Sequence, residues 1–563
     1  MPRVMSLPLI AVAFLLFLAL GYRFYGAWIA RQFRLDDTRR TPAEALNDGV
    51  DFVPTKPFYL FGQHFSAIAA AGPIAGPILA AQVFGWGPCL LWIGLGVVLI
   101  GAVHDFSSLV MSVRHGAKSV AEIAREQLGT GAGRAMLGFI WIALIYVSVA
   151  FTDITAASFV AGTDELRHAT RSAPAAAAAF SPGGAVAAAS VLYLLLSLTL
   201  GLVQRFLRPP LWLVTLIFVP ATFGVSWIGM SLSHLLVLDH RTWALLILGY
   251  CALASMTPVW LLLQPRGYLG GFVLYSALAC GVIGIFFGGY TIEQPAFKTW
   301  DAGGLTGALF PFLFVTIACG ACSGFHGLVC SGTTSKQLEH ESHARPVGYG
   351  AMLSEGFVAF IALVTVMIAT PAALSGLAPG TIYGQGIGRF LTIVLGEERL
   401  PFAITFGAMA FSTFVFDTLD VCTRLGRYIL QELFGWRSRL GATLATAFTI
   451  GPSVYFLSVA GRGSWSKFWV LFGASNQLLA ALTLLIVTLW LRQRGQRLAF
   501  TLWPMLFVLT ITMWALGRLA LENLGAARGL DVAGLNGIAA LLLLSLALYL
   551  IVSAVRSVHG NYA

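Results

Sequence analysis

The sequence predicts an all-α protein that crosses a membrane many times, and three observations carry this prediction. Of the 563 residues, 58% are hydrophobic and only 10% are charged, whereas a soluble domain needs about a quarter of its residues charged to cover its surface. Apolar runs of about 20 residues, the length that spans a bilayer as a helix, recur along the whole chain. The 61 glycines fit the same class, because small residues let transmembrane helices approach closely.

About fifteen apolar segments are long enough to span a bilayer, so we expect about fifteen transmembrane helices. By residue number the segments are 5–22, 64–82, 87–113, 132–162, 185–203, 211–231, 241–262, 270–290, 305–330, 346–372, 401–420, 439–460, 465–491, 499–521 and 535–556. The stretch Gly384–Leu395 is a candidate for a further short or re-entrant helix. The first segment is expected to be a retained helix, because no small-residue cleavage site accompanies it and many spans follow.

The basic residues predict which side of the membrane each end of the chain occupies. Most of the 34 lysines and arginines fall in one of the two sets of loops, and positively charged loops stay in the cytoplasm. With about fifteen spans, this bias places the N-terminus outside and the C-terminus inside. The same distribution accounts for the net charge of +10 without nucleic acid, which is not an expected partner; the lipid bilayer is.

The loops are too short for a soluble domain, so residues 1–563 are expected to form a single integral membrane domain. The chain has no phosphate-binding loop of the G-x-x-x-x-G-K-[ST] type, which argues against a pump driven by ATP. All seven cysteines lie in or beside apolar segments, and Cys319 and Cys322 form one C-x-x-C. Without a second such pair, buried thiols at helix contacts are the favoured interpretation, and neither a metal nor a cofactor is expected.

Two Gly-Pro pairs, Gly72-Pro73 and Gly76-Pro77, interrupt the second apolar segment. Proline removes a backbone donor and pushes the residue before it out of helical geometry, so the helix is expected to unwind at these four residues. Backbone groups freed inside a membrane are tolerated only against protein or a water-filled cavity, and secondary transporters hold substrate at such places. The pairs are therefore candidate substrate-binding residues, with a proline kink that binds no ligand as the alternative.

A second interruption runs from Ala318 to Lys336 and is rich in glycine and hydroxyl side chains. Its backbone amides and hydroxyls are candidate ligands for an anionic substrate group, helped by a helix N-terminus. The candidate substrate-binding residues here are Ser323, Gly324, Ser331, Gly332, Thr333 and Thr334. A packing face between helices is the alternative. Because the two interruptions fall near the start of each half of the chain, they form the kind of pair that points to a transporter site.

Four ionisable residues at membrane depth are candidates for carrying a proton: His64, His104, Asp105 and His326. Charged groups inside spans are costly and usually functional, and histidine titrates near neutral pH. For His104 and Asp105, a polar contact between helices or a position that reaches water near the cytoplasmic end is an equally good interpretation.

Other charged residues within the spans favour structural roles. Asp417, Asp420, Arg424 and Arg427 follow i,i+3 and i,i+4 spacing, which predicts ion pairs among them, as structure or as a gate. Glu355 stands near the start of its apolar segment and is expected to reach the interface. Neither group is counted among the candidate proton carriers.

Short sequence blocks surround the glycine, proline and ionisable residues described above. They are Phe61-Gly-Gln-His-Phe65, Gly72-Pro-Ile-Ala-Gly-Pro77, Gly101-Ala-Val-His-Asp105, Pro258-Val-Trp-Leu-Leu-Leu-Gln-Pro-Arg266, Ser323-Gly-Phe-His-Gly327, Ser331-Gly-Thr-Thr-Ser-Lys336, Tyr349-Gly-Ala-Met-Leu353, Thr418-Leu-Asp-Val-Cys-Thr-Arg-Leu-Gly-Arg427 and Gly473-Ala-Ser-Asn-Gln477. As a set that covers roughly residues 20–490, they resemble the carbon starvation protein A (CstA) family of bacterial permeases. One departure is Gln63 before His64, where the family usually has two histidines.

The resemblance implies a fold and a function. The family is linked to nutrient stress, and its members are described as peptide uptake proteins, some as proton-coupled pyruvate transporters. It is placed near the amino acid–polyamine–organocation superfamily, whose core is a LeuT-like five-plus-five inverted repeat. By that resemblance the two broken helices open the two repeats of a core at about 20–490, and residues of about 499–556 add C-terminal helices. If the missing histidine carried a proton in the family, His64 must do so alone here.

Together these observations predict a secondary active transporter of the bacterial cytoplasmic (inner) membrane. It is expected to import small carboxylates such as pyruvate, or short peptides, under carbon starvation by symport with protons. A nutrient sensor or structural subunit that binds ligand without moving it stays open as the alternative. So does sodium coupling, for which Ser412 and Thr413 are candidates, and the choice between pyruvate and peptide. An enzyme is not expected, since it would need a nucleophile–base set or a metal set, and the candidate ligands His64, His104, His326 and Asp105 are far apart in the sequence.

Overall fold

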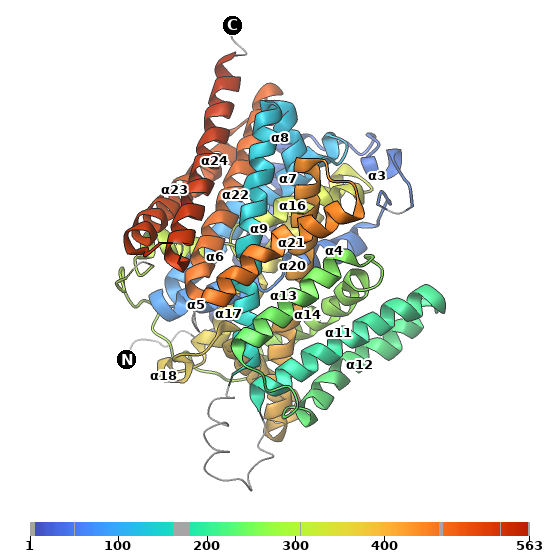
Figure 1. Ribbon diagram of the computed structural model, residues 1–563, viewed down its shortest axis with the longest axis vertical. Coiled ribbons are helices and arrows are strands. Elements are labelled where there is room, and N and C mark those ends of the chain that lie inside the picture. The colour runs from blue at the N-terminus through green and yellow to red at the C-terminus, as the bar shows by residue number, and fades with distance from the viewer. Residues whose placement is uncertain are drawn as a thin grey trace. The chain divides into compact units, whose positions relative to one another are not determined.

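Helices form almost the whole structure, a computed structural model that describes residues 6–49, 51–161, 181–304, 306–460, 465–529 and 531–560. Figure 1 shows the ribbon. Within these ranges the strand-like pairings are two isolated bridges, Thr55–Leu338 and Asp301–Ala308. The expected all-α class and the multi-pass membrane character are confirmed, because 12 of the described helical stretches are long and apolar enough to cross a membrane, or 13 if one bent pair is a span.

The difference from the expected fifteen or so spans comes from short and interrupted helices. Helix α13 (His240–Met256) has only 17 residues. The segment predicted at 305–330 is divided into α15 (Leu309–Thr316) and α16 (Gly324–Gly332), which have eight and nine residues. The candidate extra helix, Gly384–Leu395, lies within α19 (Pro379–Leu395). That α13, α15, α16 and α19 take part in crossing the bilayer therefore remains a prediction.

Two units make up the chain, and each is described by itself. The first unit contains Met1–Ile10, Ile145–Pro295 and Ile361–Ser466. The second unit contains Ala11–Leu144, Ala296–Phe360 and Lys467–Ala563. The helices that continue from one unit into the other are α1 (Leu7–Leu20), α9 (Thr130–Phe159), α17 (Ala351–Met367) and α22 (Trp465–Gln493).

In the first unit, α11 and α12 follow each other after a short connection and lie side by side, as Figure 1 shows. Its further elements are α11 (Pro182–Phe206), α12 (Leu211–Ser231), α13, α14 (Leu263–Phe287), α18 (Pro371–Leu374), α19, η7 (Glu397–Arg399), α20 (Leu400–Phe434) and α21 (Arg439–Val459). Side-chain caps begin four of these helices, where the side chains of Ser181, Asp239, Thr370 and Ser438 accept from the backbone N–H of Gly184, Thr242, Ala373 and Gly441. Glycine lets α19 and α20 touch, since a Cβ on Gly384 would lie 2.7 Å from Ala408 Cβ.

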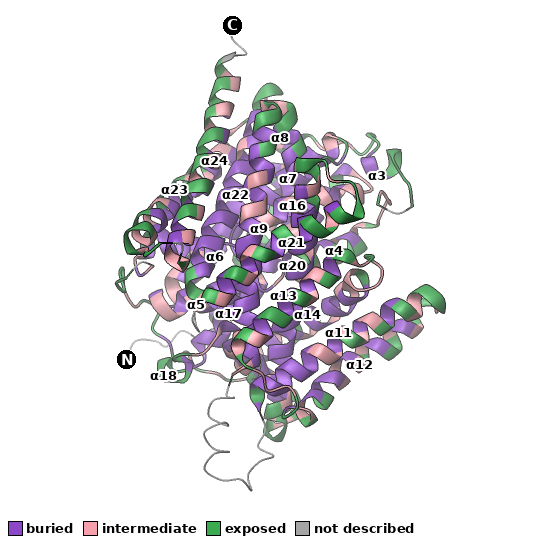
Figure 2. Cartoon of the chain, in the orientation of Figure 1, coloured by how far each residue is buried: buried purple, intermediate pink, exposed green. Residues whose placement is uncertain are grey.

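The second unit holds both interrupted helices. Its further elements are η1 (Gly21–Gly26), α2 (Ala27–Phe33), α3 (Pro42–Ala45), α4 (Pro57–Ile68), α5 (Gly72–Phe84), α6 (Trp86–Gly96), η2 (Val97–Gly101), α7 (Ala102–Arg114), α8 (Val120–Leu128), α15, α16, η4 (Thr334–Lys336), η5 (Glu341–His343), η6 (Arg345–Gly350), α23 (Ala499–Ala526) and α24 (Val532–Gly560). Figure 2 shows α22 almost entirely buried and α24 with many exposed positions. Because exposed residues of α24 are mostly apolar, such as Leu541 and Leu548, this helix is suited to face lipid.

Three π-helical turns, η1, η2 and η6, meet in the second unit beside α7. Tyr349 Oη donates to Val98 O at 2.8 Å. Small residues allow the contact, since a Cβ on Gly26 would lie 2.9 Å from Tyr349 Cε1 and one on Gly21 would lie 2.8 Å from Val98 Cγ1. The extra residue of a π-turn re-aims the helix that follows it, and here η2 leads directly into the turn of α7 that carries His104.

Candidate functional site

The first interruption separates α4 from α5, which are bent by 46° relative to each other. Residues 69–71 leave the helix, with Ala69 at ψ 54°, and Pro73 lies in the first turn of α5. The predicted position is therefore corrected, because Gly76 and Pro77 are inside α5 rather than in the break. The physical reason is that Pro73 has no N–H for the carbonyl of Ala69 and clashes with it, which ends the preceding helix, while proline is well accommodated at a helix start.

The second interruption lies between Ile317, where α15 ends at ψ 53°, and Ser323, which precedes α16. Three carbonyls at the end of α15 accept hydrogen bonds from tryptophan side chains. Trp92 Nε1 donates to Phe314 O at 3.3 Å and to Ile317 O at 3.2 Å. Trp469 Nε1 donates to Thr316 O at 3.0 Å. Buried donors thus stabilise an open helix end that hydrocarbon could not satisfy.

The two interruptions lie against each other within the second unit. A Cβ on Gly76 would lie 2.6 Å from Thr316 O, and one on Gly320 would lie 3.5 Å from Pro73 Cα. Glycine is needed at Gly76 because the backbone of α15 approaches so closely. The two interruptions, which fall near the start of each half of the sequence, are therefore neighbours in the second unit.

The first half of the predicted substrate segment, Ser323 and Gly324, is held by Asn476 of α22. Asn476 Nδ2 donates to Ser323 Oγ at 3.1 Å, and its Oδ1 accepts from the backbone N–H of Phe325 at 2.9 Å. A Cβ on Gly324 would lie 2.4 Å from Asn476 O. Gly324 therefore serves the close packing of α16 on α22, which is the alternative that the sequence left open for it.

The second half of that segment, at the end of α16, also finds partners within the protein. Ser331 Oγ donates to Gly327 O at 2.7 Å, and Thr333 Oγ1 donates to Val329 O at 3.0 Å. Around Gly332, by contrast, a Cβ would meet no atom within 4 Å. The space beside this turn lets a small group approach the backbone there.

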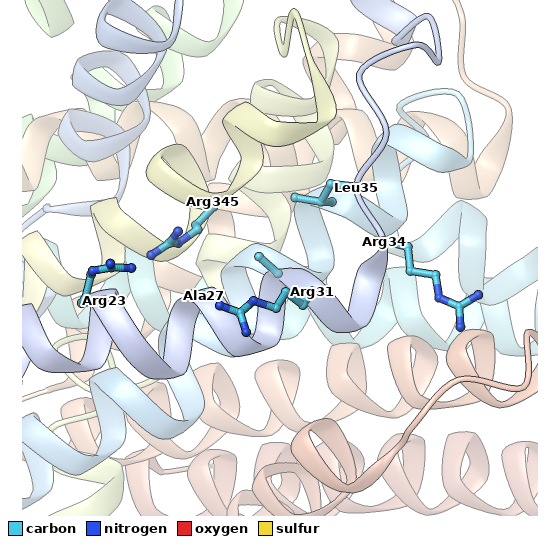
Figure 3. A pocket seen from close by; sticks show the side chains of 7 residues that line it. Arg23, Ala27, Arg31, Arg34, Leu35 and Arg345 are labelled. Atoms are coloured by element: carbon cyan, nitrogen blue, oxygen red, sulfur yellow. The ribbon is translucent and has the colours of Figure 1, made fainter.

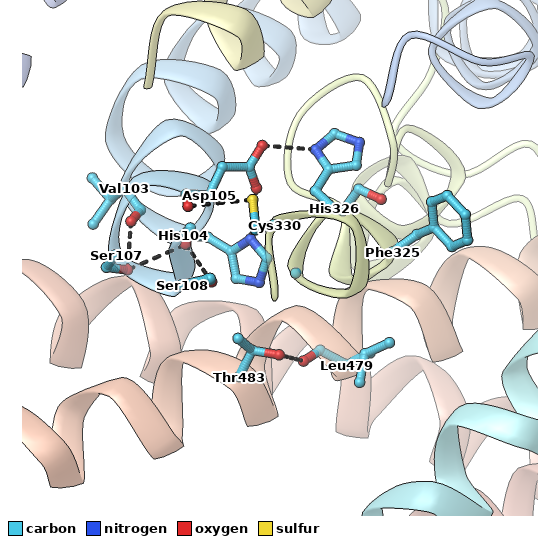
Figure 4. A network of polar contacts seen from close by, with 12 residues as sticks. Val103, His104, Asp105, Ser107, Ser108, Phe325, His326, Cys330, Leu479 and Thr483 are labelled. Atoms are coloured by element: carbon cyan, nitrogen blue, oxygen red, sulfur yellow. Dashed lines mark hydrogen bonds and ion pairs between the residues drawn. The ribbon is translucent and has the colours of Figure 1, made fainter. Parts of the chain in front are cut away.

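A chain of buried ionisable groups connects α7, α16 and α17, and Figure 4 shows its part on α7 and α16. His104 Nδ1 lies 2.7 Å from Asp105 Oδ1, and His326 Nδ1 lies 2.8 Å from Asp105 Oδ2. The other ring nitrogen of His326, Nε2, lies 3.1 Å from Glu355 Oε2. All four side chains are at most 1% exposed. Three of the four predicted proton carriers therefore form one connected cluster.

Glu355 completes this chain, and the expectation that it reaches the interface is wrong. Its side chain is fully buried at the end of a line of alternating imidazoles and carboxylates. Burial of a carboxylate in a membrane is costly unless it is paired, and His326 supplies the partner. The rule that intramembrane acids are functional by default would have selected it from the sequence.

His64, the fourth predicted proton carrier, lies beside the cluster rather than within it. Its Nδ1 is 2.8 Å from Thr334 Oγ1, and its Nε2 is 4.0 Å from Cys330 Sγ. Cys330 Sγ in turn donates to Asp105 O at 3.4 Å. His64 therefore joins the first interruption to the turn after α16, and through Cys330 it reaches only the backbone carbonyl of Asp105.

The geometry around His326 fixes what the cluster can do with a proton. Both ring nitrogens of His326 face carboxylate oxygens, and both can donate only when the ring carries two protons. If the ring gives one proton up, either Asp105 or Glu355 must take it for the contact to remain attractive. The proton can therefore move between His326 Nε2 and Glu355 Oε2 without leaving the cluster.

A second buried charged group lies in the first unit, around Arg266 of α14. Its Nε lies 2.5 Å from Asp417 Oδ1 and its Nη1 lies 2.6 Å from Asp420 Oδ2. Tyr250 Oη donates to Asp420 Oδ2 at 3.0 Å. The predicted ion pairs of these aspartates within α20 are wrong, because Arg424 Nη2 instead donates to Ala254 O at 2.7 Å.

The cysteines and possible metal ligands add no further site. All seven cysteines are buried, as expected for packing thiols. Cys319 Sγ accepts from Asn476 Nδ2 at 3.2 Å, which explains its place at the second interruption. Within the described ranges, no group of three or more histidine, cysteine, aspartate or glutamate side chains has the geometry to hold a metal ion.

The fold and the site define a class of protein: a multi-pass helical membrane protein with paired helix interruptions beside a buried His–Asp–His–Glu chain. The family model described as carbon starvation protein CstA matches residues 5–384 and 372–515. The chain therefore belongs to the CstA family.

Known relatives within this family are transporters by name. The peptide transporter CstA of Campylobacter jejuni is 35% identical, with 88% of this chain and 78% of the relative covered. The pyruvate/proton symporter BtsT of Escherichia coli K12 is 33% identical (88% and 79%), and the peptide transporter CstA of Bacillus subtilis is 33% identical (97% and 96%). Among solved structures, a manganese transporter of Eremococcus coleocola aligns with a TM-score of 0.44 at 13% identity, over 91% of this chain and 99% of its own.

Proposed function

We propose that this protein is a secondary active transporter that imports small carboxylates such as pyruvate, or short peptides, by symport with protons. The observation that carries the proposal is the placement of His326 between two buried carboxylates, next to two interrupted helices. Relatives named as peptide transporters and as a pyruvate/proton symporter support it. Membership of a transporter family also supports transport over a sensor or structural subunit.

The proton is carried by the chain of His104, Asp105, His326 and Glu355. His104 Nδ1 donates to Asp105, which leaves Nε2 as its acceptor nitrogen. This Nε2 is buried and has no hydrogen-bond partner in the part of the chain that the structure describes. A proton that arrives at His104 is balanced by Asp105, so the cluster stores it without a net buried charge.

The substrate carboxylate is held where the interrupted helices begin again. The first turns of α5, at Gly72 and Pro73, and of α16, at Ser323, present the positive ends of their helix dipoles to the region between the breaks. This arrangement is the one that transporters with discontinuous helices use for anionic groups. Of the residues proposed for binding, Gly76 and Gly324 act by close packing, and Gly332, Thr333 and Thr334 line the far end of α16.

Alternating access moves helices relative to the cluster of His104, Asp105, His326 and Glu355. We place residues 1–563 in the bacterial cytoplasmic membrane as a single integral membrane domain, with the N-terminus outside and the C-terminus inside. The two interruptions are assigned to the first helices of the two repeats of a LeuT-like core, which covers about residues 20–490. Helices α23 and α24 are additions to it.

Uptake into proteoliposomes tests this function. Labelled pyruvate and a labelled dipeptide are offered in parallel, with an imposed proton gradient, an imposed sodium gradient or neither. Accumulation of either substrate only with the proton gradient supports the proposal. Accumulation only with the sodium gradient would show that sodium, and not the proton, is the coupling ion. Saturable binding without uptake or counterflow under any condition would indicate a sensor and overturn it.

A further inference from the structure

A groove of about 500 Å³ opens beside the end of the first membrane-spanning helix. It lies in the second unit, and its lining consists of Arg23, Ala27, Ala30, Arg31, Arg34, Leu35 and Arg345. Figure 3 shows Arg23 and Arg345 towards one end, Arg34 at the other and Arg31 between them. The lining thus contains four guanidinium groups and no carboxylate.

Three of these arginines are exposed and have no counterion among the described residues. Arg23, Arg31 and Arg34 form no ion pair with any residue that the structure describes. Elsewhere in the same unit, Arg114 is paired, with its Nη2 2.8 Å from Glu341 Oε2. Like charges gathered in one groove repel each other, so an anion from outside the protein stabilises them.

The fourth arginine is held in place. Arg345 Nη2 donates to Tyr22 O at 2.7 Å, and its guanidinium lies 4.4 Å from the centroid of the Tyr22 ring. Stacking on an aromatic ring and a backbone bond fix the orientation of a guanidinium. A fixed planar guanidinium is suited to bind two oxygens of one phosphate.

The position of the groove relative to the membrane is set by the helix that carries it. Val12, Leu16 and Leu20 are 50%, 56% and 46% exposed on the apolar stretch that precedes Arg23. The Tyr25 and Trp28 rings stack at 5.7 Å just beside the arginines. Exposed leucines face lipid chains, and tyrosine and tryptophan gather at the level of the headgroups. The arginines therefore lie at the depth where lipid phosphates are found.

We propose that this groove binds the phosphate of an anionic phospholipid whose acyl chains lie along α1. The order along the helix, first exposed apolar side chains and then unpaired arginines, matches the order of chain and phosphate in a lipid. Basic pockets at the ends of spans recognise anionic headgroups. A soluble phosphate could form the same contacts with the arginines but would not contact the exposed apolar side chains of α1. The apolar stretch therefore favours a lipid as the ligand.

The lipid preference of the unmodified protein is the first test. The full chain is purified in detergent and mixed with phosphatidylglycerol and phosphatidylcholine in equal amounts, and the lipid that stays bound is identified by native mass spectrometry. We expect phosphatidylglycerol to be retained at least about tenfold more than phosphatidylcholine. Equal retention of the two lipids overturns the proposal. So does complete displacement of phosphatidylglycerol by millimolar inorganic phosphate, which would mark a site for soluble anions.

A pair of matched variants locates the site. The groove variant R23Q/R31Q/R34Q is compared with R208Q/R437Q/R439Q, which removes three exposed arginines from the first unit. We expect the groove variant to lose most of the preference for phosphatidylglycerol and the control to keep it. Equal loss in both variants would indicate a general effect of surface charge and overturn the proposal. The variant R23K/R31K/R34K retains the three positive charges and is the check on folding. We expect it to keep at least part of the preference for phosphatidylglycerol.

Discussion

His326 Nε2 lies 3.1 Å from Glu355 Oε2, in a pair whose members are at most 1% exposed and come from α16 and α17. Because the opposite nitrogen of the same ring faces Asp105 at 2.8 Å, His326 links the two carboxylates among the described contacts. The predictions on coupling follow from this arrangement.

Replacing Glu355 with glutamine is expected to separate coupling from substrate movement. The amide keeps the size of the side chain but cannot take the proton of His326. Uptake driven by a proton gradient should fall at least about tenfold, since removing one charge of a buried ion pair costs roughly 3–5 kcal/mol. Counterflow of substrate, which needs no net proton movement, should change much less. The exposed Glu398 provides the control, E398Q, and equal loss of both activities in E355Q would contradict the prediction.

His64 and His326 are expected to differ in their contribution to coupling. His64 Nδ1 contacts the hydroxyl of Thr334, whereas His326 contacts two carboxylates. H326Q should abolish uptake driven by a proton gradient, because it removes the only direct link between Asp105 and Glu355 among the described contacts. H64Q should retain much of that uptake, with a loss below about tenfold. Parallel initial rates in proteoliposomes measure both, and a larger loss in H64Q would move the proton path to the first interruption.

Two glycines on α16 provide a test of its packing. A Cβ at Gly324 would lie 2.4 Å from Asn476 O, whereas one at Gly332 would meet no atom within 4 Å. G324A should therefore lower the thermal stability in detergent strongly, at a cost of roughly 1–3 kcal/mol for overpacking. G332A should change it little. Similar stability of the two variants would mean that α16 does not rest on α22 as the structure has it.

Local rules explain why the interruptions were predictable from sequence. The effect of Pro73 on the residues before it depends only on backbone geometry, so the break could be placed within a few residues. The partners of the buried charges were not predictable in this way. His326 and Asp105 are 221 residues apart, and Arg266 and Asp417 are 151 apart, so no spacing rule connects them.

The role of Asn476 was equally hidden. Its amide bonds both to Ser323 and to the backbone of Phe325, but an asparagine inside an apolar segment predicts only that some polar partner exists. For Asp420, helical spacing predicted the wrong partner. Asp420 lies one turn from Arg424, but it pairs with Arg266. Tertiary contacts decided these pairings, because a buried guanidinium with two carboxylates satisfies more groups than a pair along one helix.

The Arg266 network gives a prediction about stability in the first unit. R266Q leaves Asp417 and Asp420 buried without their cation, and breaking a buried pair in this way costs roughly 3–5 kcal/mol. Adding D420N removes one of the two orphaned charges, so the double variant R266Q/D420N should be less destabilised than the sum of the single variants by about 1–3 kcal/mol. Thermal unfolding can be followed with a thiol-reactive dye, since all seven cysteines are buried until the protein opens. R241Q, at an exposed arginine of the neighbouring α13, should unfold like the unmodified protein. Strict additivity of R266Q and D420N would show that Arg266 and Asp420 do not interact, because only groups that share a contact produce a coupling energy in such a cycle.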